Sequence, residues 1–280
     1  MKKLKLSPEY ALSLEWSKKA YDKRIIDGFL KYIDLSSGLK LLQECTNICR
    51  WYDEVLINEI FFTRKFINSE FSREHKKRLI INLGAGNSLM SLQLLNDYYS
   101  SIDKIIEIDS ECMDEKEELY DRYYNKESEK IKCVTANITC TSILSFLSSM
   151  LQDFYINTQC VILMNNMSHH LGETELKNIL SCFRSKDKNN ILVFDYTLPP
   201  TYPDSEDYIP NQIFRTVQNK IKTTKVISYS EATIFNLFSS MGCELIEDVS
   251  IESIESHRSG SNKYFFEGTN NWVRCSAWKL

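Results

Sequence analysis

Hydrophobic positions recur at helical spacing along the first part of the chain. Between residues 8 and 78 they repeat every three or four positions, and the polar stretch Ser36-Ser37-Gly38 interrupts the pattern. Two such repeats are Tyr21, Ile25, Phe29 and Tyr32, then Trp51, Val55, Ile57 and Phe61. The spacing predicts a helical N-terminal segment over residues 1–78, made of at least two helices.

The hydrophobic pattern changes after residue 78, where short apolar runs alternate with amphipathic segments. The runs predict strands at Leu79–Leu83, Lys104–Asp109, Lys132–Ala136, Cys160–Met164 and Ile191–Tyr196. The segments between them predict helices at Ser88–Tyr99, Ser110–Tyr124, Thr141–Phe154 and Thr174–Phe183. Strands that alternate with helices are typical of an α/β fold, in which a parallel sheet is covered on both faces.

Residues 198–229 interrupt this alternation, and they hold four of the five prolines and several aromatic residues. The stretch is interpreted either as a surface excursion or as a lid over the carboxyl edge of the sheet. Beyond it, Ser230–Met241 is expected to be a helix with Gly242 at its C-cap. Cys243–Ile251 and Trp272–Trp278 alternate as strands do and are joined by a long polar link.

Composition and charge narrow the class of protein. The 280 residues are 43% hydrophobic and 12% aromatic, which is enough for a sizeable core. The formal net charge of -4 disfavours a nucleic-acid-binding role, although residues 1–78 hold 16 Lys/Arg against 11 Asp/Glu. That local excess fits either a solvated helical face or attraction of an acidic partner.

The cysteines and the N-terminal sequence indicate the cellular compartment in which the protein works. Nine cysteines are scattered without a CxxC pair, which indicates reduced thiols rather than disulfides or a structural zinc site. No apolar run follows the first lysines as a secretory signal would, and none has the length of a membrane span. We therefore expect a cytoplasmic protein that works neither in a membrane nor on nucleic acid. Its oligomeric state stays open, a homodimer included.

The ends of the predicted strands carry the candidate chemistry, because ligands of open α/β sheets bind beyond the carboxyl ends of the strands. The first strand ends in Gly84-Ala85-Gly86, where glycine permits positive φ angles and close approach of a ligand. The second ends at Asp109, whose carboxylate can accept hydrogen bonds from both hydroxyls of a ribose. Such a pair indicates an adenosine-containing cofactor. Capping of a helix that starts at Ser110 is the alternative role of Asp109.

A third glycine is missing after this turn. Dinucleotide-binding folds use it to pack the helix on the strand and to approach the pyrophosphate, whereas Asn87 and Ser88 stand here. The sequence therefore disfavours NAD, and a nicotinamide-dependent oxidoreductase is the less favoured alternative. After the third strand, Asn137 offers an amide to an adenine edge.

Two of the four histidines, His169 and His170, follow the fourth strand in the sequence NNMSHH. Imidazole has the unperturbed pKa of a general base near neutral pH. A metal site is disfavoured, because adjacent histidines usually diverge and Glu173 is the one acid at a ligand spacing. Three roles stay open: a base at the substrate, with His169 favoured, a metal ligand, or local structure.

Taken in order, the motifs INLGAG, EIDS, ANI, ILMNNMSHHL and ILVFDYTLPP resemble those of the class I S-adenosylmethionine-dependent methyltransferases. The resemblance covers residues 79–200 well and residues 230–280 loosely. It implies a Rossmann-like, seven-stranded, mostly parallel sheet with an antiparallel last strand, in a domain over residues 79–280. It also implies S-adenosylmethionine as the cofactor.

A finer similarity is to the leucine carboxyl methyltransferase family, which has NLGAG, an EID strand end and an arginine in the preceding helix. Arg50 would match that arginine and meet the methionine carboxylate of the cofactor, or else be a surface arginine. The family's aspartate after the Gly-x-Gly is absent here, and the SHHL stretch is more similar to general small-molecule methyltransferases.

The resemblance also implies roles for individual residues. Asp109 would hold the ribose, Asn137 would meet the adenine, and Asn165 would pass beneath the sulfonium. The full cofactor-binding set is Arg50, Asn82, Gly84, Ala85, Gly86, Asp109, Ser110, Asn137, Ile138 and Asn165. The expected acceptor pocket contains Asn166, Met167, Tyr196 and Tyr202.

The stretch Leu198–Tyr202 is similar to the PPY-type motif of methyltransferases that act on nucleic-acid amines. There the motif follows the fourth strand, whereas here it follows the fifth and lacks the leading Asp or Asn. We therefore expect a small-molecule acceptor, methylated on oxygen. Methylation of a nitrogen and a cofactor-binding module without activity are the alternatives.

Overall fold

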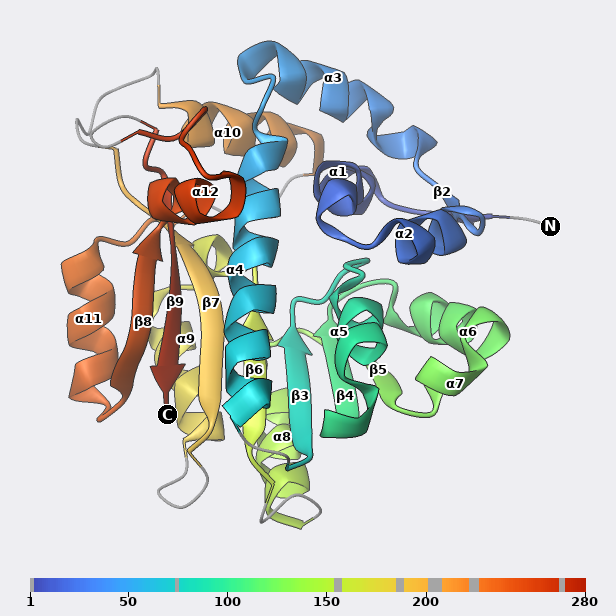
Figure 1. Ribbon diagram of the computed structural model, residues 1–280, viewed down its shortest axis with the longest axis vertical. Coiled ribbons are helices and arrows are strands. Elements are labelled where there is room, and N and C mark those ends of the chain that lie inside the picture. The colour runs from blue at the N-terminus through green and yellow to red at the C-terminus, as the bar shows by residue number, and fades with distance from the viewer. Residues whose placement is uncertain are drawn as a thin grey trace.

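The computed structural model describes residues 3–73, 76–153, 158–184, 189–200, 208–221, 227–266 and 270–280, and a seven-stranded sheet lies at its centre (Figure 1). The strands are β3 (Arg78–Leu83), β4 (Ile102–Asp109), β5 (Ile131–Thr135), β6 (Cys160–Met164), β7 (Ile191–Thr197), β8 (Glu244–Ser250) and β9 (Val273–Lys279). Their spatial order is β5-β4-β3-β6-β7-β9-β8. β9 is antiparallel to both of its neighbours, and the other pairs are parallel. The predicted Rossmann-like α/β fold with an antiparallel last strand is confirmed.

Helices cover both faces of the sheet, because its central strands are apolar on both sides (Figure 1). One face carries α4 (Asp53–Arg73), α5 (Met90–Tyr98) and α6 (Met113–Tyr123), which is followed by the short α7 (Asn125–Ser128). The other carries α8 (Thr141–Asp153), α9 (Glu173–Phe183) and α11 (Glu231–Ser240). Along β3, Ile80 joins the first core, whereas Leu79 and Ile81 join the second.

The N-terminal segment lies over the carboxyl edge of the sheet (Figure 1). Its helices are α1 (Pro8–Ser17), α2 (Lys23–Leu30) and α3 (Leu39–Ile48), and a two-stranded parallel sheet joins β1 (Leu4–Lys5) to β2 (Ile33–Asp34). The predicted break at Ser36–Gly38 is a single turn of 3-10 helix. A Cβ on Gly38 would come within 2.8 Å of Ala11 Cβ, so glycine allows this turn to pack against α1.

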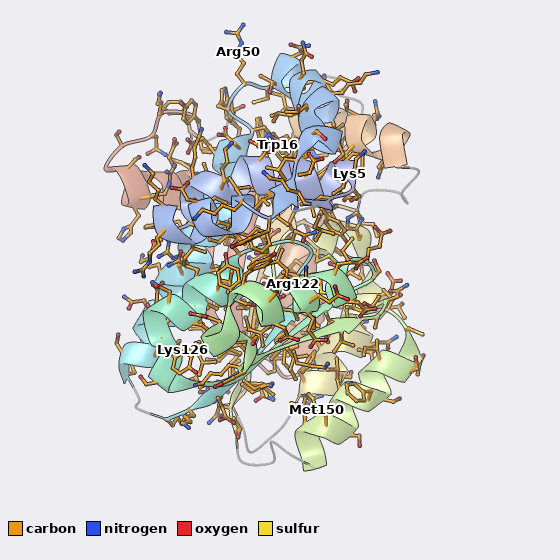
Figure 2. All side chains as sticks on the ribbon, turned by 90° about the vertical axis from the view of Figure 1, so that its right-hand side faces the viewer. Lys5, Trp16, Arg50, Arg122, Lys126 and Met150 are labelled. Atoms are coloured by element: carbon orange, nitrogen blue, oxygen red, sulfur yellow. The ribbon has the colours of Figure 1, made fainter. Side chains whose placement is uncertain are left out.

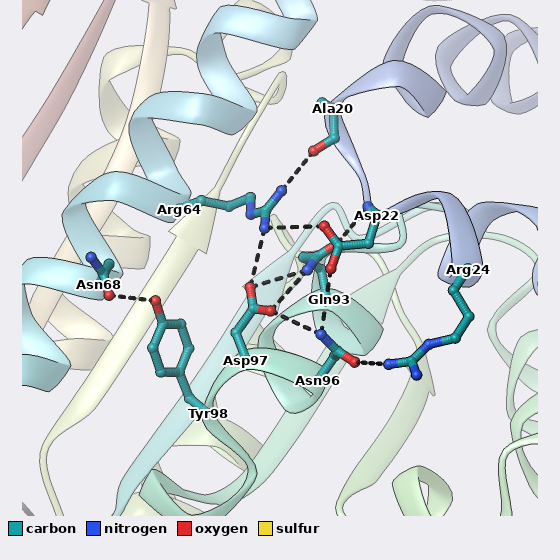
Figure 3. Close-up of polar contacts among 9 residues, drawn as sticks. All are labelled: Ala20, Asp22, Arg24, Arg64, Asn68, Gln93, Asn96, Asp97 and Tyr98. Carbon is teal, nitrogen blue, oxygen red and sulfur yellow. Dashed lines mark hydrogen bonds and ion pairs between the residues drawn. The ribbon is translucent and has the colours of Figure 1, made fainter. Parts of the chain in front are cut away.

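A polar network fastens this segment to the rest of the fold (Figure 3). Arg64 of α4 donates to the carbonyl oxygen of Ala20 (2.9 Å) and forms ion pairs with Asp97 of α5 (3.2 Å) and Asp22 (3.6 Å). The backbone amide of Asp22 donates to Gln93 of α5 (2.9 Å). Each partly exposed ion pair contributes little to the stability of the fold, but together these contacts connect α2, α4 and α5 at one point.

Residues 251–259 form helix α12 (Ile251–Ser259), where the sequence pattern predicts the end of a strand and a polar link. The Ser250 hydroxyl accepts from the amide of Ser253 at its N-cap (3.3 Å), and Gly260 ends it with a φ of +77°. The helix packs on α4 at the carboxyl edge. Residues 251–259 contain too few apolar positions for a helical repeat to be visible in the sequence. The helix is therefore stabilised mainly by its packing on α4.

Helix α10 (Ile209–Ile221) is the part of the 198–229 stretch that the structure describes as regular. It packs on α3 and α1 in a third hydrophobic core, which contains Leu12, Tyr52 and Ile213 among its buried residues. This core lies over the carboxyl edge, so the described part of the stretch covers that edge (Figure 1). Among the helices in the described ranges, none is both long and apolar enough to cross a membrane.

Candidate functional site

The turn after β3 has backbone geometry that suits glycine. Gly84 has a φ of +66° and Gly86 a φ of +44°, both in the left-handed region. The Gly84 amide donates to the carbonyl of Ile108 (2.8 Å), and the Gly86 amide donates to the Asp109 carboxylate (2.9 Å). A Cβ on Gly84 would come within 2.2 Å of the Met167 side chain. Gly84 is therefore required both by its φ angle and by the space around it.

Asp109 ends β4 and is 8% exposed. Besides the amide of Gly86, it accepts hydrogen bonds from the Tyr10 hydroxyl of α1 (2.5 Å) and from the amide of Ser110 (2.7 Å). Helix α6 begins at Met113, with Cys112 as its N-cap residue, so Asp109 does not cap it. The carboxylate instead joins the glycine turn, the end of β4 and the N-terminal helix.

A cavity of about 540 Å³, called the larger cavity below, opens beside this turn. Its volume lies within the range of small-molecule sites. Four strand ends and the loops after them supply nine of the ten predicted cofactor residues: Asn82, Gly84, Ala85, Gly86, Asp109, Ser110, Asn137, Ile138 and Asn165. Residues of α1 and α4 line it too, so the N-terminal helices complete this site.

Buried polar atoms without a partner lie in the lining of the larger cavity. Within the described residues, Asn82 Nδ2 and both polar side-chain atoms of Asn87 make no hydrogen bond. The two side chains are 4% and 3% exposed. An unpaired buried polar group costs about 1–3 kcal/mol, so a ligand that offers an acceptor and a donor here would recover that energy.

Asn137 is exposed and lies in the loop after β5. Its side-chain oxygen accepts from the amide (3.0 Å) and the hydroxyl (2.9 Å) of Thr139, which fixes the amide plane. The amide NH₂ group remains as the donor that can face a ligand, and the buried Ile138 offers an apolar contact next to it.

A smaller cavity, of about 60 Å³, adjoins the larger one. Aromatic side chains line it, namely Trp16 of α1, Tyr52 in the turn before α4, and Phe214 of α10. The residues that line both cavities are Glu9, Ser13, Leu56, Glu59, Asn166 and His170. These shared residues form the junction, where a molecule in one cavity would meet a molecule in the other.

His169 and His170 lie in a turn of 3-10 helix after β6, and His170 is at this junction whereas His169 lines the smaller cavity alone. His169 is buried in the smaller cavity and stacks on Phe214, with ring centroids 4.8 Å apart. Burial, and next the neighbouring His170, hold the pKa of His169 well below its usual value. Burial also lowers the pKa of His170, and Asp109 offsets part of that. Both imidazoles are therefore neutral at pH 7, the form that a general base needs.

Two buried carboxyl groups face the smaller cavity from opposite elements, Glu59 on α4 and Asp195 on β7. Asp195 accepts from the amide of Asn166 (2.7 Å) and from the side chain of Asn165 (3.4 Å). Burial raises the pKa of Asp195 to about 6 despite these hydrogen bonds. Burial, and next the charge of Asp195, raise the pKa of Glu59 as well. Both groups thus lack a charge partner within the described chain.

Several solved structures share this fold. A DUF574 family protein from Streptomyces avermitilis has a TM-score of 0.58 at 10% identity, with 98% of this chain and 97% of that one covered. A proposed methyltransferase from Thermobifida fusca has a TM-score of 0.59 at 11% identity, with 92% and 94% covered. A geranyl diphosphate methyltransferase, solved with S-adenosylmethionine, has a TM-score of 0.52 at 9% identity, with 78% and 84% covered. The chain has the class I methyltransferase fold.

Comparison at the level of sequence finds no relative. No family model matches the chain, and no curated protein matches it. At identities of 9% to 11% the structural likeness shows the fold alone, so the function must be argued from the site.

Two predicted positions lie away from both cavities, and a third is outside the described residues. Arg50 is exposed between α3 and α4, points away from the body of the protein (Figure 2), and lines neither cavity. Tyr196 is buried on the opposite face of β7 from the cavities, where its hydroxyl donates to Asp248 (3.2 Å), so it is not in the acceptor pocket. Tyr202 lies outside the described residues.

The sequence pattern misses three residues that the structure brings to the site. Asp195 stands inside an apolar strand, ILVFDY, and Glu59 stands inside an apolar helical stretch, INEIFF. A carboxylate within an apolar run could have identified both residues as candidates for the site from the sequence, because such a group is rarely buried without a function. Tyr10 has no comparable signal, since its contact with Asp109 joins positions 99 residues apart.

Proposed function

We propose that this protein is an S-adenosylmethionine-dependent methyltransferase that acts on a small molecule. The observation that carries the proposal is the convergence of the glycine turn, Asp109, Asn137 and Asn165 on one cavity with a second cavity at its end. A cofactor with an adenosine part would lie along the strand ends, and the acceptor would enter from the smaller cavity.

The charge of the site supports this cofactor over NAD. Among the described residues, six carboxylates line the two cavities, and neither lysine nor arginine does. S-adenosylmethionine carries a sulfonium and an ammonium cation, which an acidic cavity stabilises, whereas a pyrophosphate would be repelled. The unpaired atoms of Asn82 and Asn87 fit the ammonium and carboxylate of a methionine tail.

Bound S-adenosylmethionine supplies an electrophilic methyl group, and the chain has to orient the two reactants. Asp109 would bind the ribose hydroxyls, and Ile138 would pack on the adenine beside the Asn137 amide. Asn165 is held by Thr63 (3.0 Å), so its position at the cavity wall is fixed before ligand arrives. A fixed wall at the junction favours an in-line arrangement of nucleophile, methyl carbon and sulfur.

His170 is the better candidate for the general base. The sequence favours His169, but that ring lines the smaller cavity alone, whereas His170 lines both. A base has to reach the acceptor atom that faces the methyl group, and this atom must lie at the junction. His170 would there accept the proton that the acceptor loses.

Transfer of a labelled methyl group tests the proposal. The full chain, incubated with methyl-labelled S-adenosylmethionine and a fractionated metabolite extract, should yield a labelled small molecule. The Asp109→Ala variant should yield far less at a limiting cofactor concentration. Binding of S-adenosylmethionine without transfer to any fraction would contradict the assignment as an enzyme and favour a cofactor-binding module.

A further inference from the structure

The junction of the two cavities is both acidic and aromatic. Glu59 lines the two cavities and Asp195 lines the smaller one, while Trp16, Tyr52 and Phe214 form apolar walls beside them. Tyr52 packs against Trp16 with ring centroids 5.2 Å apart, so these walls are built as a unit. Carboxylates between aromatic faces form a recurrent binding site for organic cations.

The two carboxyl groups have no compensating charge. Glu59 and Asp195 are both 3% exposed, and the basic residues of the described chain line neither cavity. The hydrogen bonds at the Asp195 carboxyl come from amide groups of Asn165 and Asn166, and within the described residues no hydrogen bond to the Glu59 carboxyl is seen, since Thr63 donates to the Glu59 backbone carbonyl instead (3.1 Å). Removing one buried carboxylate from water is costly, and two near each other cost more, unless a cation joins them.

The arrangement also selects among acceptors. A carboxylate or phosphate would meet two buried acids and neither lysine nor arginine among the described lining residues, and a neutral alcohol would leave the acids uncompensated. A divalent metal ion is not favoured, because the described residues contain no group of three or more metal-ligating side chains. A protonated amine meets both the charge and the aromatic walls.

We propose that the methyl acceptor is a small amine with an apolar body, whose ammonium group binds between Glu59 and Asp195 and whose nitrogen receives the methyl group. The proposal rests on the methyltransferase function argued above. It replaces the oxygen acceptor expected from the sequence with a nitrogen acceptor.

The reaction balances without a further reactant. The bound ammonium, R–NH₃⁺, gives one proton to Glu59 or His170, which both line the junction. The freed lone pair forms a bond to the methyl carbon as the carbon–sulfur bond breaks, and that electron pair goes to sulfur. The products are R–NH₂⁺–CH₃ and S-adenosylhomocysteine. The amine nitrogen is positively charged before deprotonation and again after methyl transfer, and it is neutral only while its lone pair attacks the methyl carbon.

Three probes that share a benzyl group test this assignment on the full chain saturated with S-adenosylhomocysteine: benzylamine, benzyl alcohol and phenylacetate. Calorimetry should show benzylamine binding at least tenfold more tightly than benzyl alcohol, and no binding of phenylacetate. Equal affinity for amine and alcohol, or no response to any probe while S-adenosylhomocysteine binds, would overturn the amine proposal alone. Absence of S-adenosylhomocysteine binding would instead count against the methyltransferase function.

Variants locate the amine. Glu59→Gln and Asp195→Asn keep the shape of each side chain, and each should weaken benzylamine binding at least tenfold while the affinity for S-adenosylhomocysteine changes less than threefold. Glu70→Gln removes a carboxylate from the same helix, where Glu70 pairs with Arg73 outside both cavities, and should change neither affinity. Retained amine binding in both site variants, with S-adenosylhomocysteine binding intact, would contradict the proposed contacts.

Discussion

The two cavities of the site are built in different ways. The larger one is lined by backbone turns and side chains that directly follow four neighbouring strands, and nine of its residues were expected from the order of motifs. The smaller one is assembled by α1, α4, α10 and β7, from residues that are far apart in the chain. Glu59 and Asp195 are an example, since 136 positions separate them.

This difference follows from the physics of the fold. Parallel strands place their carboxyl ends at one edge, so a cofactor site arises from local sequence at each end. The acceptor site depends on how helices pack over that edge, which no local pattern encodes. It also contains buried acids that cost stability, as expected where function rather than folding selects a residue. Substitutions in the larger cavity and in the smaller cavity should therefore have different effects on cofactor binding and on turnover.

The largest effect is expected from His170→Ala, which changes the junction and leaves the cofactor side intact. Loss of a general base lowers turnover by about 100-fold or more, while the affinity for S-adenosylhomocysteine should change by less than about threefold. Steady-state kinetics and calorimetry measure the two quantities. His169→Ala is the matched variant and should lose less turnover. Full activity of His170→Ala would show that His170 is not the general base and has a structural role.

Asp195→Asn should stabilise the protein, because burial raises the pKa of the native carboxyl from its ordinary value of 3.8 to about 6. Native Asp195 keeps its proton up to a higher pH than Asp195 of the unfolded chain does. Ionisation of the buried carboxyl therefore lowers the free energy of unfolding. This loss is absent below the pKa of the unfolded chain, grows as the pH rises, and is complete above pH 6. The gain in free energy of unfolding should be about 2 kcal/mol at pH 8 and smaller at pH 5.

Urea denaturation at the two pH values checks this prediction. Asp248→Asn, on the edge strand β8 of the same sheet, is the control, because Asp248 pairs with Arg274 (2.7 Å) and its loss should destabilise the protein at pH 8. A destabilised Asp195→Asn variant would show that this carboxylate is stabilising and that its burial carries no penalty.

Gly84→Ala tests the cofactor side. The new methyl would meet Met167 in a backbone with a φ of +66°, so we expect about twentyfold weaker binding of S-adenosylhomocysteine. Gly260→Ala has a similar φ of +77° but open space around the new methyl, and it should leave the affinity unchanged. If both variants bind equally well, the close contact at Gly84 is unimportant for the ligand.

Asp109→Ala should cost about 1.5 kcal/mol in the affinity for S-adenosylhomocysteine, roughly tenfold, since a carboxylate that holds ribose hydroxyls makes charged hydrogen bonds. Asp114→Asn is the control, because that carboxylate binds Thr135 (3.0 Å) and does not line the larger cavity. Unchanged affinity in Asp109→Ala would remove the ribose assignment and leave Asp109 as a structural link to Tyr10.

Particular residues show what the sequence could and could not predict. Gly84 and Asp109, which were predicted to bind the cofactor because strand ends can be located from apolar runs, line one cavity. Tyr196 was wrong by a single position, since the pattern locates β7 but not which of its faces meets the cavity, and Asp195 occupies that face. The helix expected to begin at Arg50 begins at Asp53, so Arg50 lies in the exposed segment between α3 and α4 and outside both cavities.

Binding of cofactor fragments to the unmodified chain tests the central claim most directly. Calorimetry with S-adenosylhomocysteine and with NAD, each alone, compares a ligand that has an amino-acid tail with one that has a pyrophosphate. The account predicts a dissociation constant of about 1–100 μM for S-adenosylhomocysteine, and no heat from NAD at millimolar concentration. Binding of NAD together with no response to S-adenosylhomocysteine would contradict it.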